Sequence, residues 1–164
     1  MTDPAIDDVC ELRPIGYVRT KRKDIEDDNW GGIRSHIELT SVFDEEALVG
    51  LEAFSHVEIV YYFDRVDPAK IVSGARHPRN NPDWPRVGIF AQRGKNRPNR
   101  LGLTIARLIE VSGTTLVIEG LDAIDGTPVL DIKPVMREFL PVGAVRQPDW
   151  ATQLMDCYWD VKGG

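Results

Sequence analysis

Residues 87–134 read VGIFAQRGKNRPNRLGLTIARLIEVSGTTLVIEGLDAIDGTPVLDIKP, and this stretch decides the fold. Two apolar runs in it, residues 87–91 and 101–111, are rich in residues that favour strands, and they enclose a polar segment with Asn and Pro. Apolar runs bounded by turn residues are typical of strands. We therefore expect a polar, basic loop that is presented between two strands.

The same segment has an unusual charge. Six cationic side chains and no carboxylate occur from residue 86 to residue 107, although the formal net charge of the chain is −6. These six are Arg86, Arg93, Lys95, Arg97, Arg100 and Arg107. A local cationic cluster of this kind marks a candidate site for an anionic ligand.

Strand patterns dominate the rest of the chain. Residues 54–63, FSHVEIVYYF, alternate between two faces, and residues 103–111 and 115–119 predict a hairpin that turns at Ser112-Gly113. Shorter strands are expected within residues 12–20, at 36–39 and at 129–132, and a helical turn capped by Asp44 is expected at 44–49. Tight hairpins favour a mainly β fold, an antiparallel single-sheeted β-barrel with a few short helices. No GxGxxG motif opens a helix after a strand, so a dinucleotide-type site is not expected.

Composition sets the outer bounds. A chain of 164 residues, 42% of them hydrophobic, is long enough for one ordinary domain. The acidic N-terminus and the absence of a long apolar run predict a cytoplasmic protein with no membrane partner. The two cysteines have no spacing that suggests zinc or a disulfide framework. We expect an acidic disordered tail at 1–11, the barrel domain at 12–140, and a C-terminal extension at 141–164 with a short amphipathic helix from Asp149.

Four motifs in the same order resemble the TsaA-like family, the TrmO tRNA methyltransferases. They are RPIGYVRT, GLEAFSHVEIVYYFDR, IFAQRGKNRPNRLGL and GLDAIDGTPVLDIKP. The resemblance implies a β-barrel that binds S-adenosylmethionine and is completed by a homodimer. It also implies methylation of N6 of threonylcarbamoyladenosine at position 37, in the anticodon loop of tRNA.

The resemblance, with the charge pattern, gives a set of expected site residues. Arg93 and the turn at Asp125 are expected to hold the cofactor, and Leu103 to pack against it; the expected cofactor-binding set is Trp30, Gly31, Asp64, Arg65, Arg93, Leu103, Asp125, Gly126, Thr127 and Pro128. Guanidinium groups hold carboxylates and phosphates in a fixed geometry. The expected substrate-binding set is Arg76, His77, Arg79, Arg97, Asn99, Arg100 and Lys133. An amide-like nitrogen is a weak nucleophile, and Asp131 is the carboxylate that we select as its proton acceptor.

Alternatives stay open at this stage. Arg100-Leu101 stands where the family usually has Pro-Ile, Val135 stands where a Tyr usually follows, and Asp64 stands where a His is common. The chain is therefore also compatible with a cofactor-binding or RNA-binding module without methyl transfer, or with a methyltransferase for another small or nucleoside acceptor. Asp122, Asp125 and Asp131 resemble a cation cluster, but Lys133 beside them provides a counter-ion, so no metal is expected.

Overall fold

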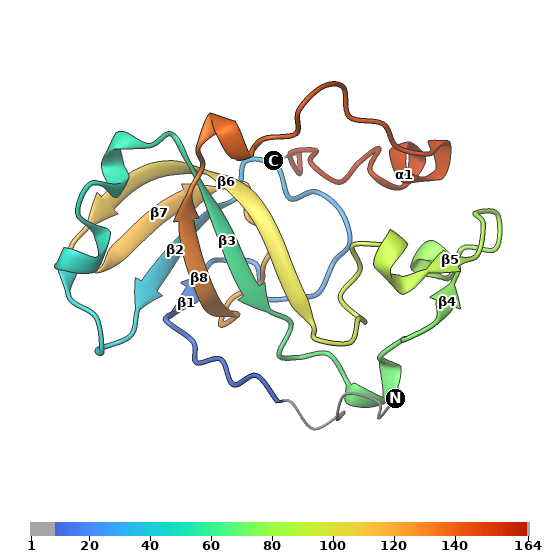
Figure 1. The fold of residues 1–164 in the computed structure, drawn as a ribbon, viewed down its shortest axis with the longest axis horizontal. Helices are drawn as coiled ribbons and strands as arrows, with labels where there is room; N and C mark the ends of the chain where they lie inside the picture. The colour runs from blue at the N-terminus through green and yellow to red at the C-terminus, as the bar shows by residue number, and fades with distance from the viewer. Residues whose placement is uncertain (1–8, 164) are drawn as a thin grey trace, which may run out of the picture.

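The computed structural model describes residues 9–163, and six antiparallel strands in it close into a barrel (Figure 1). The strands follow one another around the barrel in the order β1-β2-β7-β6-β3-β8. Their bounds are β1 Gly16–Arg19, β2 Arg34–Leu39, β3 His56–Tyr62, β6 Leu101–Ser112, β7 Thr115–Glu119 and β8 Pro128–Pro134. The expected mainly β, antiparallel barrel is confirmed.

The core of the barrel follows from alternation along the strands. On β3, Val57, Ile59 and Tyr61 point inward and are buried, whereas their neighbours are half-buried. Buried side chains of the other strands, such as Ile37 and Leu116, complete the same cluster. Because successive side chains of a strand face opposite sides, the period-two pattern of residues 54–63 correctly predicts which residues form the core.

The predicted hairpin is also confirmed. β6 and β7 pair from Arg107 with Glu119 to Ser112 with Thr115, and Gly113 in the turn has φ of 58°. A positive φ at this position favours glycine, which has no Cβ to clash with the backbone. β6 is longer than expected and also pairs with β3 over its first half, so it links the two sides of the barrel.

A small lobe lies beside the barrel, at the right in Figure 1. It contains a two-stranded sheet of β4 (Ala75–Arg76) and β5 (Val87–Gly88), with the 3₁₀ helices η3 (Pro68–Lys70), η4 (Pro78–Asn80) and η5 (Ile89–Ala91). The expected strand at 87–91 is wrong beyond Gly88. The Gln92 amide N–H bonds back to the carbonyl of Ile89 (3.2 Å), which closes a 3₁₀ turn in place of a strand.

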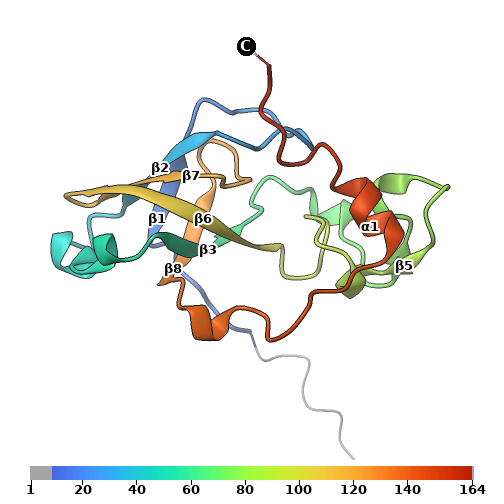
Figure 2. The ribbon, with the colours of Figure 1, turned by 90° about the horizontal axis from the view of Figure 1, so that it is seen from above.

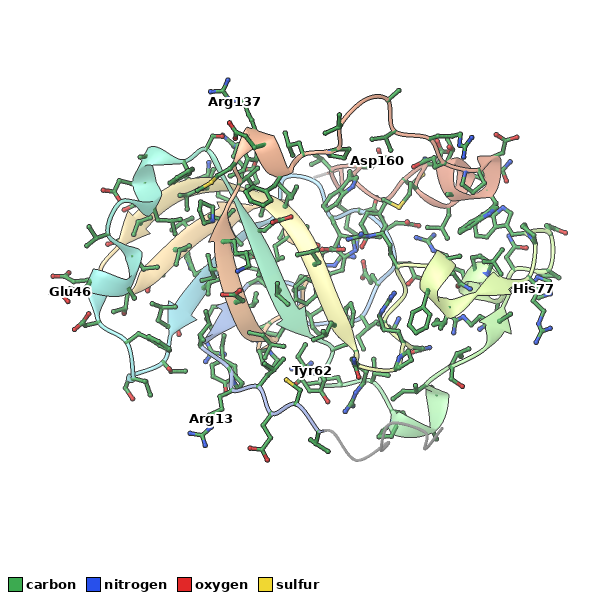
Figure 3. All side chains as sticks on the ribbon, in the orientation of Figure 1. Arg13, Glu46, Tyr62, His77, Arg137 and Asp160 are labelled. Carbon is green, nitrogen blue, oxygen red and sulfur yellow. The ribbon has the colours of Figure 1, made fainter. Side chains whose placement is uncertain are left out.

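Short helices close the end of the barrel away from this lobe. η1 (Glu45–Leu48) begins at Asp44, whose carboxylate accepts the Glu46 amide N–H at 3.0 Å, as the capping pattern predicts. η2 (Leu51–Ala53) follows it, and Figure 3 shows Glu46 at the outer edge of this end. η6 (Arg137–Phe139) follows β8.

The short helix expected from Asp149 is present. α1 spans Asp149–Leu154, and the following residues form turns, so Cys157 and Tyr158 do not lie on the helix. Figures 1 and 2 both show α1 beside the β4-β5 lobe, and the indole Nε1 of Trp84 donates to Gln153 at 2.8 Å. Across residues 9–163, no helix has the length and apolar character needed to cross a membrane. Residues 1–8 of the expected acidic tail lie outside the described part of the chain.

Candidate functional site

A deep cleft lies between the barrel, the small lobe and the C-terminal segment, with a volume of about 1540 Å³. Strands β3 and β6 form its barrel wall, residues 90–99 form the opposite wall, and residues 146–159 cover it. A single drug-sized ligand occupies a pocket of roughly 300–1000 Å³. The cleft is therefore large enough for two ligands side by side.

Seven cationic side chains and five carboxylates line the cleft, and the carboxylates are Glu26, Asp27, Glu58, Asp64 and Asp122. The cationic residues are Arg65, Arg76, Arg79, Arg93, Lys95, Arg97 and Arg146. Two of them belong to the basic loop and bond to backbone carbonyls. Arg93 Nη2 donates to the carbonyl of Leu103 (2.5 Å), and Arg97 Nη1 donates to the carbonyl of Gln92 (2.7 Å). Gln92 itself is buried and donates to the carbonyls of Arg76 and Val87. The basic loop is thus fixed to the small lobe through one buried amide.

Arg76 has a donor without a partner. Its Nε is buried and makes no hydrogen bond with any residue of the described chain, although the side chain lines the cleft. A buried donor without an acceptor costs on the order of 1–3 kcal/mol.

Among the carboxylates of the cleft, Asp122 is surrounded by hydroxyl groups. Tyr61 donates to Oδ1 at 2.9 Å, Thr104 also donates to Oδ1, and Tyr158 donates to Oδ2. Burial of Tyr61 and of Tyr158, followed by the negative charge of Asp122, raises the pKa of both phenols. Both therefore stay protonated as donors, while the charge of Arg93 acts in the opposite direction on each.

Tyr158 reaches Asp122 because the C-terminal segment is bonded to the loop before β2. The amide N–H groups of Asn29, Trp30 and Gly31 donate to the carbonyls of Cys157 (3.1 Å), Tyr158 (2.8 Å) and Asp160 (3.2 Å). A Cβ on Gly31 would lie 2.0 Å from the backbone oxygen of Trp159. Only glycine permits this close approach. Figure 3 shows Asp160 along this segment, above the cleft side of the barrel.

Trp30 lies in this loop with 4% of its surface exposed. The guanidinium of Arg22 stacks on the indole at 3.7 Å and donates to the carbonyls of Asn29 and Asp28. Trp30 also lines the cleft. Arg22 therefore covers the indole ring, and Trp30 presents little exposed surface.

The turn at Asp125 is fixed to the barrel by its own polar groups. Asp125 Oδ1 accepts the Thr20 amide N–H (3.1 Å), its amide N–H donates to the carbonyl of Arg22, and its carbonyl accepts Arg65 Nη2 at 3.1 Å. Gly126 has φ of 83°, and the Thr127 hydroxyl donates to the carbonyl of Ile124. Of the four turn residues, only Thr127 lines the cleft.

The structure divides the expected site residues into two sets. Those that line the cleft are Trp30, Asp64, Arg65, Arg76, Arg79, Arg93, Arg97, Asn99, Leu103 and Thr127. Those that do not line it are Gly31, His77, Arg100, Asp125, Gly126, Pro128, Asp131 and Lys133. His77 bonds through Nδ1 with the carbonyl of Trp84 (2.7 Å) and lies at the outer end of the small lobe in Figure 3.

Other basic residues are already paired with protein groups. Arg79 makes a two-bond ion pair with Asp28, at 2.8 and 3.2 Å, and Arg107 pairs with Glu119 at 2.8 Å. Arg100 stacks on Tyr62 at 4.7 Å and donates to the carbonyl of Val66. The cationic run of the sequence is therefore not one surface in space.

Asp131 also lies away from the cleft. It is half-exposed on β8, its carboxylate pairs with Lys133 at 3.0 Å, and Lys133 lines a smaller hollow on the outer face of the barrel. Within residues 9–163, no group of three or more His, Cys, Asp or Glu side chains is arranged to hold a metal ion.

Sequence reasoning did not identify the hydroxyl cluster around Asp122. Its members come from β3, β6, the loop before β8 and the C-terminal segment, so no local spacing relates them. The available sequence signal was the position of Asp122, which is the first Asp of GLDAIDG and lies in the same motif as Asp125.

Comparison with known proteins identifies the family. The model of the tRNA-methyltransferase O N-terminal domain matches residues 24–139. A probable S-adenosyl-L-methionine-binding protein of Methanothermobacter thermautotrophicus is 34% identical over 135 residues, which are 80% of this chain and 94% of that protein. The tRNA (adenine(37)-N6)-methyltransferase of Mus musculus is 42% identical over 95 residues, 58% of this chain and 22% of that protein.

Solved structures agree with this assignment. The crystal structure of TrmO from P. aeruginosa matches with a TM-score of 0.70 and 30% identity, over 87% of this chain and 62% of that one. This chain spans only about a fifth of the length of the mammalian relatives, at 22% and 23%. The match over residues 24–139 and the shared barrel show that the chain belongs to the tRNA-methyltransferase O N-terminal domain family.

Proposed function

We propose that the chain binds S-adenosylmethionine in the cleft and transfers its methyl group to N6 of threonylcarbamoyladenosine 37 in tRNA. The observation that carries the proposal is the cleft itself, which has an excess of cationic over anionic side chains and a volume of about 1540 Å³. Support also comes from the relatives, several of which are named probable S-adenosyl-L-methionine-binding proteins.

The residues present fit such a cofactor. Arg93 offers donors for its carboxylate, and Leu103 and Phe90 offer apolar surface for its adenosine part. A hydrogen bond to a charged group contributes roughly 1.5–3 kcal/mol. When bound, the sulfonium supplies a methyl group that is already activated by positive charge. The protein's contribution is then to hold the accepting atom in line with it.

The tRNA substrate is supported by the names of the mammalian relatives and by unpaired charge at the cleft. Lys95 and Arg146 line it, and neither takes part in an ion pair within residues 9–163. Phosphate contacts by such groups give affinity that falls with salt. Arg79 contributes less because its guanidinium is paired with Asp28, and Arg100 and Arg107 contribute less because they do not line the cleft.

A homodimer is part of the same proposal. The outer face of β6 exposes Leu103 and Ile105, at 44% and 45%, and the segment after β8 exposes Met136 and Phe139, the latter at 83%. A contiguous exposed apolar patch commonly marks a contact surface. Since Leu103 and Ile105 also line the cleft, a second copy seated there would help to close it.

A second function has some support. Three archaeal relatives are named only as S-adenosyl-L-methionine-binding proteins, so a binding role without methyl transfer is the main competitor. Titration calorimetry with S-adenosylmethionine tests cofactor binding, which both functions require. Saturable binding with one site per chain is expected, and no binding at millimolar concentration would contradict both. Methyl transfer to tRNA then separates the two.

A further inference from the structure

We propose that Asp122 is the residue that binds the N–H group of the methyl acceptor and takes its proton during transfer. This inference rests on the proposed methyl transfer and adds a role that neither the sequence motifs nor the relatives' names assign. It is carried by the position of Asp122 in the wall of the cleft and by the hydroxyl groups that hold it.

The carboxylate has one acceptor position left. Two carboxylate oxygens offer about four lone-pair sites. The hydroxyls of Tyr61 and Thr104 take up two on Oδ1, and the hydroxyl of Tyr158 takes up one on Oδ2. The free site therefore belongs to Oδ2, and a ligand N–H in the cleft is a group that would fill it.

Asp122 also lacks a counter-charge. No Lys, Arg or His of residues 9–163 lies within 4 Å of its carboxylate, whereas the carboxylates of Asp28 and Glu26 are both paired. The carboxylate thus has hydroxyl partners but no neighbouring cation, and its free acceptor site faces a ligand in the cleft.

The orientation of Asp122 is fixed by three separate elements. Tyr61 comes from β3, Thr104 from β6 and Tyr158 from the C-terminal segment, which follows the part of the chain that the family model matches. Tyr61 and Tyr158 keep their protons, since burial raises the pKa of each. They are positioning residues, and together with Thr104 they aim the one free lone pair at the ligand.

The proton balance of the transfer requires such a group. The acceptor nitrogen is amide-like, so its lone pair is delocalised and its nucleophilicity is low until the N–H proton leaves. As the nitrogen forms its bond to the methyl carbon, the methyl–sulfur bond breaks and its electron pair stays on sulfur. The N–H proton passes to Oδ2 of Asp122, the N–H bonding pair stays on nitrogen, and the proton later leaves to water.

Asp131, the carboxylate selected from the sequence, is less suited to this role. It faces the outer surface of the barrel and is neutralised by Lys133 at 3.0 Å, and neither residue lines the cleft. The two aspartates provide a matched pair for a test, because each can be changed to the isosteric amide.

The test compares Asp122→Asn, Asp131→Asn and the surface control Glu38→Gln, which removes an exposed ion pair with Arg19. Single-turnover methylation of threonylcarbamoyl-modified tRNA is measured at saturating cofactor, with calorimetric Kd values for S-adenosylmethionine and tRNA Kd values in the presence of S-adenosylhomocysteine. Asp122→Asn is expected to lower the rate by about 10²–10⁴-fold, to leave the cofactor Kd within about threefold, and to weaken tRNA binding only modestly. Glu38→Gln is expected to match the wild type.

A second variant guards against a mere folding defect. Tyr158→Phe removes one donor from the Asp122 carboxylate and should lower the single-turnover rate while leaving the Kd for S-adenosylmethionine within about threefold. A loss of cofactor binding in parallel with the loss of rate would make Tyr158 a purely structural residue and would overturn the assignment.

The remaining outcomes are also decisive. A normal rate in Asp122→Asn, or a loss confined to Asp131→Asn, overturns the inference while methyl transfer by the wild type still stands. A tenfold or larger rise in the cofactor Kd of Asp122→Asn would assign the carboxylate to a cationic group of the cofactor, and would overturn it too. A wild type that binds the cofactor and methylates no tRNA contradicts the proposed function instead.

Discussion

The attachment of the C-terminal segment can be tested at Gly31. Replacing it by alanine places a Cβ 2.0 Å from the backbone oxygen of Trp159 and 2.9 Å from its carbonyl carbon. Both contacts are with backbone, so no side chain can rotate away to relieve them. The segment must move off the loop before β2.

The expected cost follows from the three backbone hydrogen bonds at this contact, which have lengths of 2.8 to 3.2 Å. Each contributes roughly 0.5–1.5 kcal/mol, so Gly31→Ala should lower the free energy of unfolding by about 1.5–4.5 kcal/mol. The hydrogen bond from Tyr158 to Asp122 would be lost with them.

Urea unfolding at neutral pH measures the change, and hydrogen exchange of the amides of Asn29, Trp30 and Gly31 locates it. Gly88→Ala is the matched control, because Gly88 has φ of −60° and no heavy atom within 4 Å of the added Cβ. That control should change stability by less than about 1 kcal/mol. If Gly31→Ala is equally mild and exchange at residues 29–31 is unchanged, the described attachment is refuted.

Four further predictions concern the site and the surface. Arg93→Ala should raise the calorimetric Kd for S-adenosylmethionine by tenfold or more, since a charged hydrogen bond is worth roughly 1.5–3 kcal/mol, and an unchanged Kd would remove Arg93 from the cofactor site. Lys95→Gln should leave that Kd within twofold but reduce the salt dependence of tRNA binding by about one phosphate contact, and an identical salt slope would contradict its role. Phe139→Asp should convert a dimer to a monomer in light scattering, and a wild type that is already monomeric with full cofactor binding would refute the proposed interface. The hydrogen bond from Arg107 lowers the pKa of Glu119 below its ordinary value of 4.5. The ionised Glu119 therefore stabilises the fold above that pH, and this stabilisation is lost as the pH falls through the lowered pKa. In urea unfolding at a series of acidic pH values, the stability of Glu119→Gln should fall less with pH than that of the wild type, and an equal fall would contradict this.

The sequence was sufficient for the barrel because local patterns define its strands. Alternation from Val57 to Tyr61 marks an inward face, and Ser112-Gly113 marks a tight hairpin, so each strand can be found without knowledge of its partners. The same reasoning failed at residues 89–91. There the buried amide of Gln92, with acceptors in the small lobe, favours a 3₁₀ turn over an extended strand.

The site was harder to predict because its contacts join distant residues. Asp122 and Tyr158 are separated by 36 positions, and Tyr61 precedes Asp122 by 61. No spacing rule links them. Charge patterns were also misleading, since Arg79 and Arg107 look available in the sequence but are paired with Asp28 and Glu119 in space.

The most direct test of the account is mass analysis of tRNA nucleosides. The purified chain is incubated with S-adenosylmethionine and with tRNA that carries threonylcarbamoyladenosine at position 37, and the same tRNA without that modification serves as the control. The account predicts a threonylcarbamoyladenosine nucleoside heavier by one methyl group in place of one hydrogen, only in the modified tRNA. An unchanged nucleoside at full cofactor occupancy, or a methyl group on another nucleoside, would contradict it.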